Sequence, residues 1–202
     1  MEDVKKQAIE TYNKIAKTYA NYTSEKIFQY QLNKFISLLP KSPKVLDVGC
    51  AAGRDVAYLS EENVNVIGID LSEGLLSEAK ERVPKAEFIK MDFTKTSFNN
   101  EAFDGIWCMA SLSDIPKVQT RATLKEFNRI LIKGGVIYIA VKEGLGEKII
   151  KKEKYENNPR FYSFFMLPEL EEFLILENFQ IVSSLISDDD GTKWVEIFAR
   201  KI

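Results

Sequence analysis

Hydrophobic and polar positions divide the chain into stretches with different periods. In residues 1–40, apolar side chains recur three and four positions apart, which predicts two helices. In residues 44–141, short apolar runs alternate with helical patterns. The runs Val45–Val48 and Val136–Val141 are continuously apolar, as is typical of strands covered on both faces. This alternation predicts a parallel sheet with helices on both sides.

The last third of the chain follows a different pattern. Residues 142–168 show no clean period. Phe179–Ile186 and Trp194–Ala199 have the pattern of strands, and the Asp-Gly step within Asp188–Gly191 favours an antiparallel hairpin between them. We therefore expect an α/β fold with a doubly wound, mostly parallel sheet and an antiparallel C-terminal hairpin, in one domain over residues 1–202.

Composition and charge narrow the possible partners. The chain has 202 residues, 45% of them hydrophobic and 29% charged, which is typical of a globular domain. Its 28 basic and 30 acidic side chains give a net charge of −2, so we expect no nucleic-acid partner. No apolar run reaches the roughly 18 residues of a membrane span, and we expect no membrane association. Two cysteines are too few for a disulfide framework, which favours a cytoplasmic location. Nothing in the sequence indicates the oligomeric state.

The chain contains no histidine. This excludes serine and cysteine triads, histidine-ligated zinc sites and histidine acid–base catalysis, and we expect no metal. Carboxylates, tyrosines, lysines, backbone groups or a cofactor must carry any chemistry.

A loop of small residues follows the first predicted strand, and two cofactor patterns compete for it. A dinucleotide site requires G-x-G-x-x-G. Counted from Gly49, that pattern places Ala51 at its middle glycine and the long side chain of Arg54 at its last glycine. The alternative pattern, acid-x-G-x-G-x-G, fits Asp47, Gly49 and Gly53 with Ala51 as its one departure. Small residues in either case allow a ligand to approach the backbone.

Acidic residues end the next two predicted strands. Asp70 lies about twenty residues beyond the loop, where a carboxylate can bind both hydroxyls of a ribose. Asp92 ends the third strand and can accept a hydrogen bond from an adenine amino group, with Met91 or Phe93 beside the ring.

Together these segments resemble the class I S-adenosylmethionine-dependent methyltransferases, over roughly residues 12–202. Residues 103–112 resemble the family's fourth-strand motif, and residues 129–135 resemble its turn from a helix into the fifth strand. The antiparallel C-terminal hairpin is also a family hallmark. Within the family, the chain resembles a subgroup of small bacterial and archaeal enzymes whose acceptors are mostly unassigned.

The resemblance implies a Rossmann-like fold that binds S-adenosyl-L-methionine. Residues 1–40 are then a helical lid, residues 44–202 the Rossmann-like core, and residues 142–168 an insertion on the substrate side. The implied cofactor-binding residues are Tyr19, Asp47, Gly49, Cys50, Ala51, Gly53, Arg54, Asp70, Leu71, Met91, Asp92, Phe93 and Cys108.

The resemblance also bears on the acceptor. The subgroup commonly has a histidine shortly before an Ile/Val-Pro step, where this chain has Asp114. If the acceptor is a hydroxyl, Asp114 is the candidate catalytic base, with Glu143 or a tyrosine as alternatives. Relatives that methylate amides and nucleobase amines carry Asn/Asp-Pro-Pro-Tyr/Phe after the fourth strand, and residues 108–111 lack it. We therefore expect a small-molecule acceptor.

The predicted function is methyl transfer, in which the cofactor carries the electrophilic group and the protein supplies positioning. A non-catalytic S-adenosylmethionine-binding module and a nicotinamide-dependent reductase are the alternatives. We expect the acceptor pocket above the carboxyl ends of the strands. Its expected parts are the N-terminal helix with Tyr12, Tyr19 and Tyr22, the turn at Asp114, and Arg160–Phe165.

Overall fold

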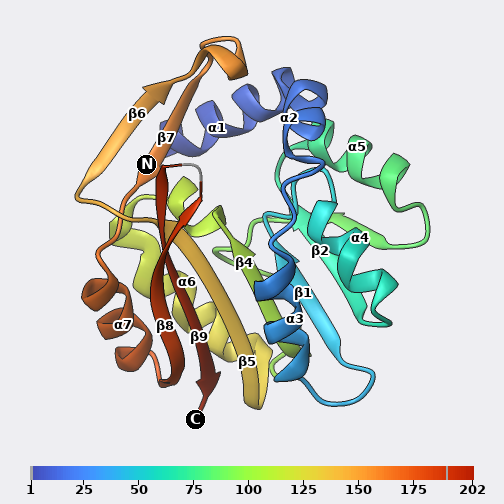
Figure 1. Cartoon of the computed structure of the whole chain (residues 1–202), viewed down its shortest axis with the longest axis vertical. Helices are drawn as coiled ribbons and strands as arrows, with labels where there is room; N and C mark the ends of the chain where they lie inside the picture. Colours follow the sequence, from blue (N-terminus) through green and yellow to red (C-terminus); the bar gives the residue numbers. More distant parts are fainter. Residues whose placement is uncertain (1, 190) are drawn as a thin grey trace.

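The computed structural model describes residues 2–189 and 191–202 and contains a seven-stranded sheet with strand order β3-β2-β1-β4-β5-β9-β8 (Figure 1). The strands from β3 to β5 are parallel, whereas β9 runs antiparallel to both β5 and β8. A separate antiparallel ribbon pairs β6 with β7. The predicted mostly parallel sheet with an antiparallel C-terminal hairpin is confirmed. The strands are β1 (Lys44–Val48), β2 (Asn65–Asp70), β3 (Glu87–Lys90), β4 (Phe103–Met109), β5 (Leu131–Lys142), β6 (Glu147–Lys151), β7 (Pro159–Ser163), β8 (Phe179–Asp189) and β9 (Thr192–Lys201).

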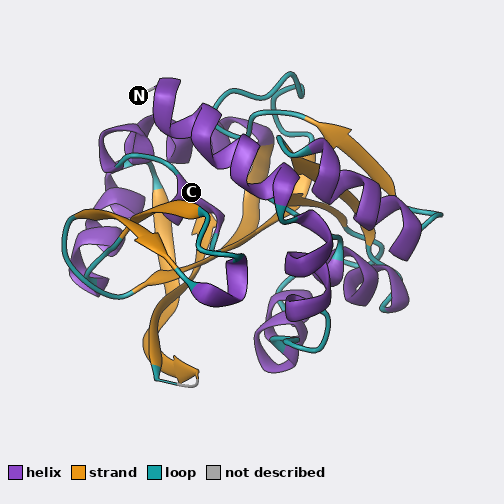
Figure 2. Ribbon diagram, turned by 90° about the horizontal axis from the view of Figure 1, so that it is seen from above, coloured by secondary structure: helices purple, strands orange, loops and turns teal. Residues whose placement is uncertain are grey.

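Helices cover both faces of the seven-stranded sheet. Phe127 of α6 and Leu174 of α7 pack on one face, whereas Phe35 of α3 and Leu59 of α4 pack on the other. Leu76 of α5 packs on the same face as Phe35 and Leu59. Helices α1 and α2 lie at one end of the sheet beside the β6–β7 ribbon, and the view from that end shows α1 crossing over the strands (Figures 1 and 2). The helices are α1 (Glu2–Lys14), α2 (Ala16–Thr23), α3 (Gln29–Ser37), α4 (Arg54–Glu61), α5 (Glu73–Arg82), α6 (Lys117–Ile130) and α7 (Leu167–Leu176), with short 3₁₀ helices η1 (Ser111–Asp114) and η2 (Glu153–Tyr155).

Local sequence explains the start of α5, because Ser72 before it is a residue type that caps helices. The Ser72 hydroxyl accepts a hydrogen bond from the amide of Leu75 at 3.2 Å, which satisfies one of the otherwise unpaired amides of the first turn. Leu75, Leu76 and Ala79 form the buried face of the helix. The cap fixes where the chain leaves β2. It therefore helps to fix the position of Asp70, the last residue of this strand.

The glycine pair after α6 has a different role from the predicted one. The sequence predicts that the helix ends at Gly134-Gly135 and that a strand begins at Val136. Instead, α6 ends at Ile130 and β5 begins at Leu131. The register against β4 shifts before Val136, and Gly134 has a φ of +77°. The two glycines therefore lie in an irregular stretch of the strand, where a left-handed conformation is needed.

The N-terminal region contains three helices where two were predicted. A break at Ile15 separates α1 from α2. Because of this break, Ala16 and Ala20 of α2 pack against Leu75 of α5, while α1 contacts β7. In the C-terminal hairpin, Asp190 of the predicted Asp-Gly turn lies outside the described residues.

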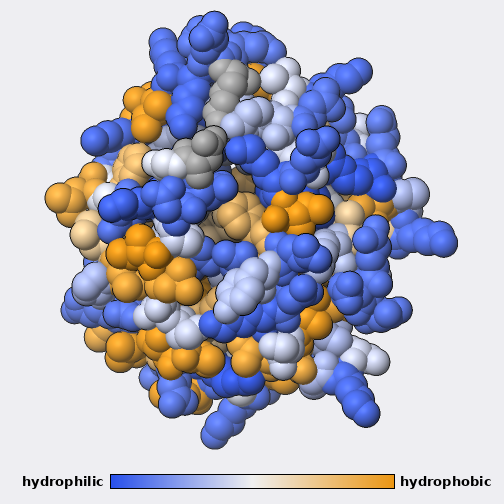
Figure 3. Space-filling view, in the orientation of Figure 1, coloured by the Kyte–Doolittle hydropathy of each residue, from blue (hydrophilic) through white to orange (hydrophobic). Residues whose placement is uncertain are grey.

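Several exposed apolar side chains lie on α7 and β8, and Figure 3 shows apolar surface on the side of the molecule where α7 lies. They are Ile175, Leu176, Val182, Leu185 and Ile186. None of the helices in the described parts of the chain is long and apolar enough to cross a membrane.

Candidate functional site

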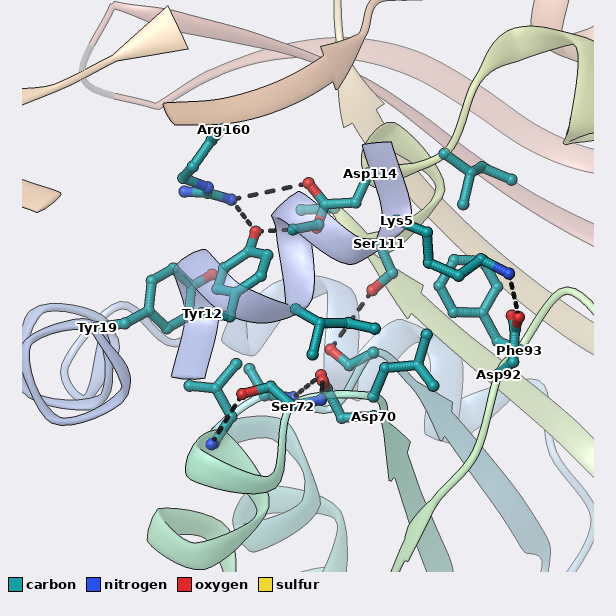
Figure 4. Close-up of a pocket in the computed structure, with 18 of the residues that line it drawn as sticks. Lys5, Tyr12, Tyr19, Asp70, Ser72, Asp92, Phe93, Ser111, Asp114 and Arg160 are labelled. Atoms are coloured by element: carbon teal, nitrogen blue, oxygen red, sulfur yellow. Dashed lines mark hydrogen bonds and ion pairs between the residues drawn. The ribbon is translucent and has the colours of Figure 1, made fainter. Parts of the chain in front are cut away.

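A cleft lies beyond the carboxyl ends of β1, β2 and β4, beneath α1 and next to β7 (Figure 4). Its empty volume is about 870 Å³ when the open space at its mouth is included. A smaller cavity of about 360 Å³ adjoins it and shares Tyr19, Gly49, Ala51 and Met109 with it. Both cavities lie at the carboxyl ends of the parallel strands, which is the position at which open α/β sheets bind ligands.

The loop between β1 and α4 brings backbone to the floor of the cleft. Gly49, Ala51 and Gly53 all have positive φ, at +68°, +49° and +74°. A Cβ atom added to Gly49 would lie 2.3 Å from the hydroxyl oxygen of Ser111, so this glycine is required by close approach as well as by conformation. The Ser111 hydroxyl donates to the carbonyl of Val48 at 2.6 Å, which joins the ends of β1 and β4.

The carboxylate of Asp70 is held by backbone amides. Its Oδ2 accepts from the amide of Ala51 at 3.0 Å, and its Oδ1 accepts from the amide of Ser72 at 2.8 Å. Burial raises the pKa of Asp70 to about 6, although the two amide hydrogen bonds oppose this shift. Each carboxylate oxygen can accept a further hydrogen bond from a ligand in the cleft.

Asp92 lies farther along the same cleft, beyond the end of β3. Its Oδ1 accepts from the amide and the hydroxyl of Thr94, at 2.9 and 2.7 Å, and its Oδ2 pairs with the ammonium group of Lys5 on α1. Burial opposes the ionisation of Asp92, but the hydrogen bonds from Lys5 and Thr94 outweigh it and hold the pKa of Asp92 below its usual value. The ring of Phe93 also lines the cleft. The Lys5 ion pair connects α1 to the sheet across the cleft.

The smaller cavity contains a second group of acidic residues. Arg54 binds Asp55 through both Nε and Nη2, at 2.6 and 2.7 Å, and the indole of Trp107 donates to Asp55 at 2.9 Å. Asp47 is buried next to this pair, and its Oδ2 has no hydrogen-bond partner among the described residues. Burial, together with the charge of Asp55, raises the pKa of Asp47 well above its usual value. The unpaired oxygen fits a hydrogen-bond donor or a cation in this cavity.

At the opposite end of the cleft, Asp114, Tyr12 and Arg160 form a connected group (Figure 4). The Tyr12 hydroxyl donates to Asp114 Oδ2 at 2.9 Å and accepts from Nη2 of Arg160. Arg160 Nη2 also lies 3.9 Å from Asp114 Oδ1. Burial raises the pKa of Asp114, against the charges of Arg160 and Lys142 and the hydrogen bond from Tyr12. A carboxylate with a raised pKa is a stronger base than an exposed one.

Four tyrosine rings surround the guanidinium group of Arg160. Its Cζ lies 4.8 Å from the ring centres of Tyr12 and Tyr162, 5.0 Å from Tyr155 and 5.5 Å from Tyr19. The rings also contact one another, with 5.5 Å between Tyr12 and Tyr19. These residues come from α1, α2, η2 and β7, so the N-terminal helices and residues 142–168 meet at this end of the cleft.

Most of the predicted site residues line one of the two cavities. Those that do are Tyr19, Asp47, Gly49, Cys50, Ala51, Arg54, Asp70, Leu71, Asp92, Phe93 and Asp114. Gly53, Met91 and Cys108 line neither cavity. A Cβ atom on Gly53 would lie 3.1 Å from both Ala79 and Phe88, so this glycine faces the core, and Cys108 is fully buried. Cofactor contacts by these three residues stay predictions.

Lys5, Ile9 and Ser111 also line the cleft, although the sequence analysis did not single them out. Lys5, Ile9 and Tyr12 are spaced four and three positions apart, so they lie on one face of α1, and this spacing was a usable signal. Among residues 2–189 and 191–202, no group of three or more cysteine, aspartate or glutamate side chains is placed to hold a metal ion.

Comparisons with known proteins agree with the geometry. Residues 45–135 match a family model described as "Methyltransferase domain". The chain is 29% identical over 146 residues to the ubiquinone/menaquinone biosynthesis C-methyltransferase UbiE of Campylobacter jejuni, covering 65% of this chain and 61% of that protein. It is 30% identical over 111 residues to a trans-aconitate 2-methyltransferase of Variovorax paradoxus, covering 54% of this chain and 42% of that protein. The chain thus spans less than two thirds of the length of these curated relatives.

Solved structures share the fold. A SAM-dependent methyltransferase from Methanosarcina mazei superimposes with a TM-score of 0.76 at 20% identity, covering 84% of this chain and 97% of that one. The Burkholderia thailandensis 1,6-didemethyltoxoflavin-N1-methyltransferase, solved with 1,6-didemethyltoxoflavin and S-adenosylhomocysteine, superimposes with a TM-score of 0.67 at 21% identity, covering 96% of this chain and 90% of that one.

Proposed function

Because the chain belongs to the class I S-adenosylmethionine-dependent methyltransferases, we propose that it transfers the methyl group of S-adenosyl-L-methionine to a small-molecule acceptor. The observation that carries the proposal is a row of carboxylates at the ends of three neighbouring parallel strands. Asp47 lies near the end of β1, Asp70 ends β2 and Asp92 follows β3, and they line two adjoining cavities.

The residues present fit this cofactor. Asp70 would hold the ribose hydroxyls, since two amides fix its carboxylate and leave it further acceptor capacity. Asp92 and Phe93 would hold the adenine. Asp47 would hold the ammonium group, because its buried Oδ2 otherwise has no partner in the described part of the chain. When bound, the cofactor supplies an electrophilic methyl group, so the protein needs no histidine to activate it.

The chain's own residues position the acceptor and handle its proton. The cleft between the sheet, α1 and β7 would hold the acceptor beside the cofactor, and positioning of this kind can lower a barrier by up to about 7–11 kcal/mol. We assign Asp114 as the base for a hydroxyl acceptor: burial raises its pKa, and Tyr12 fixes the carboxylate by donating to Oδ2. A thiolate or neutral amine acceptor would need no base.

The alternatives receive less support from this site. A nicotinamide-dependent reductase requires a small residue at the position of Arg54, and the Arg54 guanidinium is instead bound to Asp55. A non-catalytic binding module would need no buried carboxylate and arginine at the far end of the cleft, where Asp114 and Arg160 lie. A cytoplasmic location and the lack of a nucleic-acid partner stay predictions from composition.

Isothermal titration and product analysis test the proposal. We expect S-adenosylmethionine and S-adenosylhomocysteine to bind with 1:1 stoichiometry and NADH not to bind. We also expect release of S-adenosylhomocysteine with at least one member of a panel of small hydroxyl, amine and carboxylate acceptors. Binding of NADH in place of S-adenosylmethionine would support the reductase, and tight cofactor binding without turnover across a broad panel would support the binding module.

A further inference from the structure

Arg160 is buried and hydrogen-bonded to the hydroxyls of Tyr12 and Tyr155, but one of its donors has no partner in the described part of the chain. It is 9% exposed, lies in the second position of β7 and lines the cleft. Its Nε has no hydrogen-bond partner among the described residues. The nearest carboxylate oxygen, Asp114 Oδ1, is 3.9 Å from Nη2, which is beyond hydrogen-bond distance. A guanidinium group has five N–H donors, and leaving buried donors unpaired is unfavourable.

The four tyrosines around Arg160, here called the tyrosine cage, make its guanidinium group a site selective for anions. They are Tyr12, Tyr19, Tyr155 and Tyr162. Rings at 4.8–5.5 Å from Cζ stabilise the cation through their faces and keep bulk water away from it. A charge-assisted hydrogen bond is stronger when its groups are desolvated. Arginine presents its donors as a planar fork that matches a carboxylate, so the cage favours a planar anion over a neutral ligand.

Two cationic side chains act on Asp114 at this end of the cleft. Arg160 and Lys142 are cationic, and the Lys142 ammonium lies 3.7 Å from the ring centre of Tyr162. Asp114 is the anion that faces both cations, and both lower its pKa. Asp70 is held by backbone amides, and Asp92 is paired with Lys5 at the cofactor end. An anionic ligand group beside Arg160 would be attracted by this cation.

We propose that Arg160 binds a carboxylate group of the methyl acceptor, so the acceptor is a small organic acid. This inference rests on the proposed methyltransferase function. The carboxylate of the cofactor itself is the alternative ligand, but the geometry disfavours it. The cofactor's amino-acid end would lie with Asp47 and Arg54 in the smaller cavity, and Arg160 does not line that cavity.

Titrations of simple carboxylates test the proposal in the presence of saturating S-adenosylhomocysteine. The probes are benzoate, 3-phenylpropionate and succinate, each paired with its neutral amide. We expect at least one carboxylate to bind saturably, its amide to bind at least tenfold more weakly, and Arg160→Met to weaken carboxylate binding at least tenfold. Arg160→Lys keeps the positive charge but loses the forked pair of donors. Its affinity for the carboxylate should lie between those of the wild type and Arg160→Met. Arg121→Met is the control, at an exposed arginine of α6 that pairs with Glu177. This variant should bind the carboxylate probes as tightly as the wild type does.

A second pair of titrations separates the two possible carboxylates. S-adenosylhomocysteine carries a carboxylate, whereas 5′-methylthioadenosine lacks the amino-acid end. If Arg160→Met and Arg160→Lys weaken S-adenosylhomocysteine but not 5′-methylthioadenosine, Arg160 binds the cofactor's carboxylate and the proposal is overturned. It is also overturned if the carboxylate probes bind both Arg160 variants as tightly as the wild type, or if none binds a wild-type protein that binds S-adenosylhomocysteine. Failure of S-adenosylhomocysteine to bind the wild type contradicts the methyltransferase function instead. Thermal unfolding checks that each variant is folded, and Arg160→Lys serves alone if Arg160→Met is not.

Discussion

The two ends of the cleft are built in different ways. At the cofactor end, backbone groups of one continuous loop and of the next strand end position the key carboxylate: the amides of Ala51 and Ser72 bind Asp70. At the acceptor end, side chains from three distant segments position one another, with Tyr12 of α1 joining Arg160 of β7 to Asp114. The first arrangement depends on main-chain conformation, whereas the second depends on how separate elements dock.

This difference determines how each end should respond to change. Substitutions at the cofactor end alter backbone geometry, and their effects should be large and depend little on other residues. Substitutions at the acceptor end remove one member of a network, so their effects should be smaller or coupled to those of neighbours.

The largest effect is expected at Gly49. In Gly49→Ala, the new Cβ would lie 2.3 Å from the Ser111 hydroxyl at a φ of +68°, so we expect binding of S-adenosylhomocysteine to be lost. The left-handed conformation alone would lower the free energy of unfolding by roughly 1–3 kcal/mol. Ala51→Gly is the matched control: Ala51 already has a φ of +49°, and glycine adopts this conformation more readily. Titration calorimetry and urea unfolding measure both effects. Normal binding by Gly49→Ala would show that the loop is less constrained than the structure indicates.

The next effect concerns the charge of Asp70. We expect Asp70→Asn to weaken S-adenosylhomocysteine binding at least tenfold at pH 7.5, because hydrogen bonds to a charged acceptor contribute about 1.5–3 kcal/mol each. The pKa of Asp70 is raised by burial to about 6, so its carboxylate is ionised above that pH and protonated below it. The ratio of the wild-type affinity for S-adenosylhomocysteine to that of Asp70→Asn should therefore be constant above pH 7. This ratio should decrease as the pH falls through 6. Calorimetry at pH 5, 6, 7 and 8 measures this ratio, and a ratio that does not change with pH would contradict the assignment of Asp70.

The smallest effect is expected for the ion pair between Lys5 and Asp92, which links α1 to the sheet. Both side chains are partly exposed, at 38% and 27%, and such pairs contribute about 0–1 kcal/mol. We expect Lys5→Met to speed amide exchange in α1 by up to about fivefold without changing exchange in β1 or β4. In the wild type, S-adenosylhomocysteine should slow exchange in α1. Lys6→Met, at an exposed neighbouring position, is the control. Equal exchange in α1 and β1 of the ligand-free protein would argue against a lid.

The same contrast explains what the sequence could predict. Strand β1, the glycine loop and Asp70 follow from apolar runs, turn residues and spacing, all of which act over short stretches of chain. The Ser72 cap is equally local. These site residues are positioned by backbone conformation. Tyr12, Asp114 and Arg160 were also named from the sequence, but the hydrogen bonds that join them were not.

The features that were missed depend on contacts across the chain. Lys5 reaches Asp92 only because α1 crosses the sheet, and Trp107 reaches Asp55 only because β4 lies beside β1. The extension of β5 back to Leu131 requires its partner Phe103 on β4, which overrides the helix-ending preference of Gly134. Local propensity carries no information about such pairings.

The β6–β7 ribbon has a consequence for how this molecule can change over generations. Its two strands pair with each other, and it enters the chain between β5 and α7 without interrupting any strand of the seven-stranded sheet. A duplicated gene could therefore exchange this ribbon, and Arg160 with it, while keeping an intact cofactor end. New acceptor preferences would then arise by replacement of one short segment, and the older machinery would be inherited unaltered.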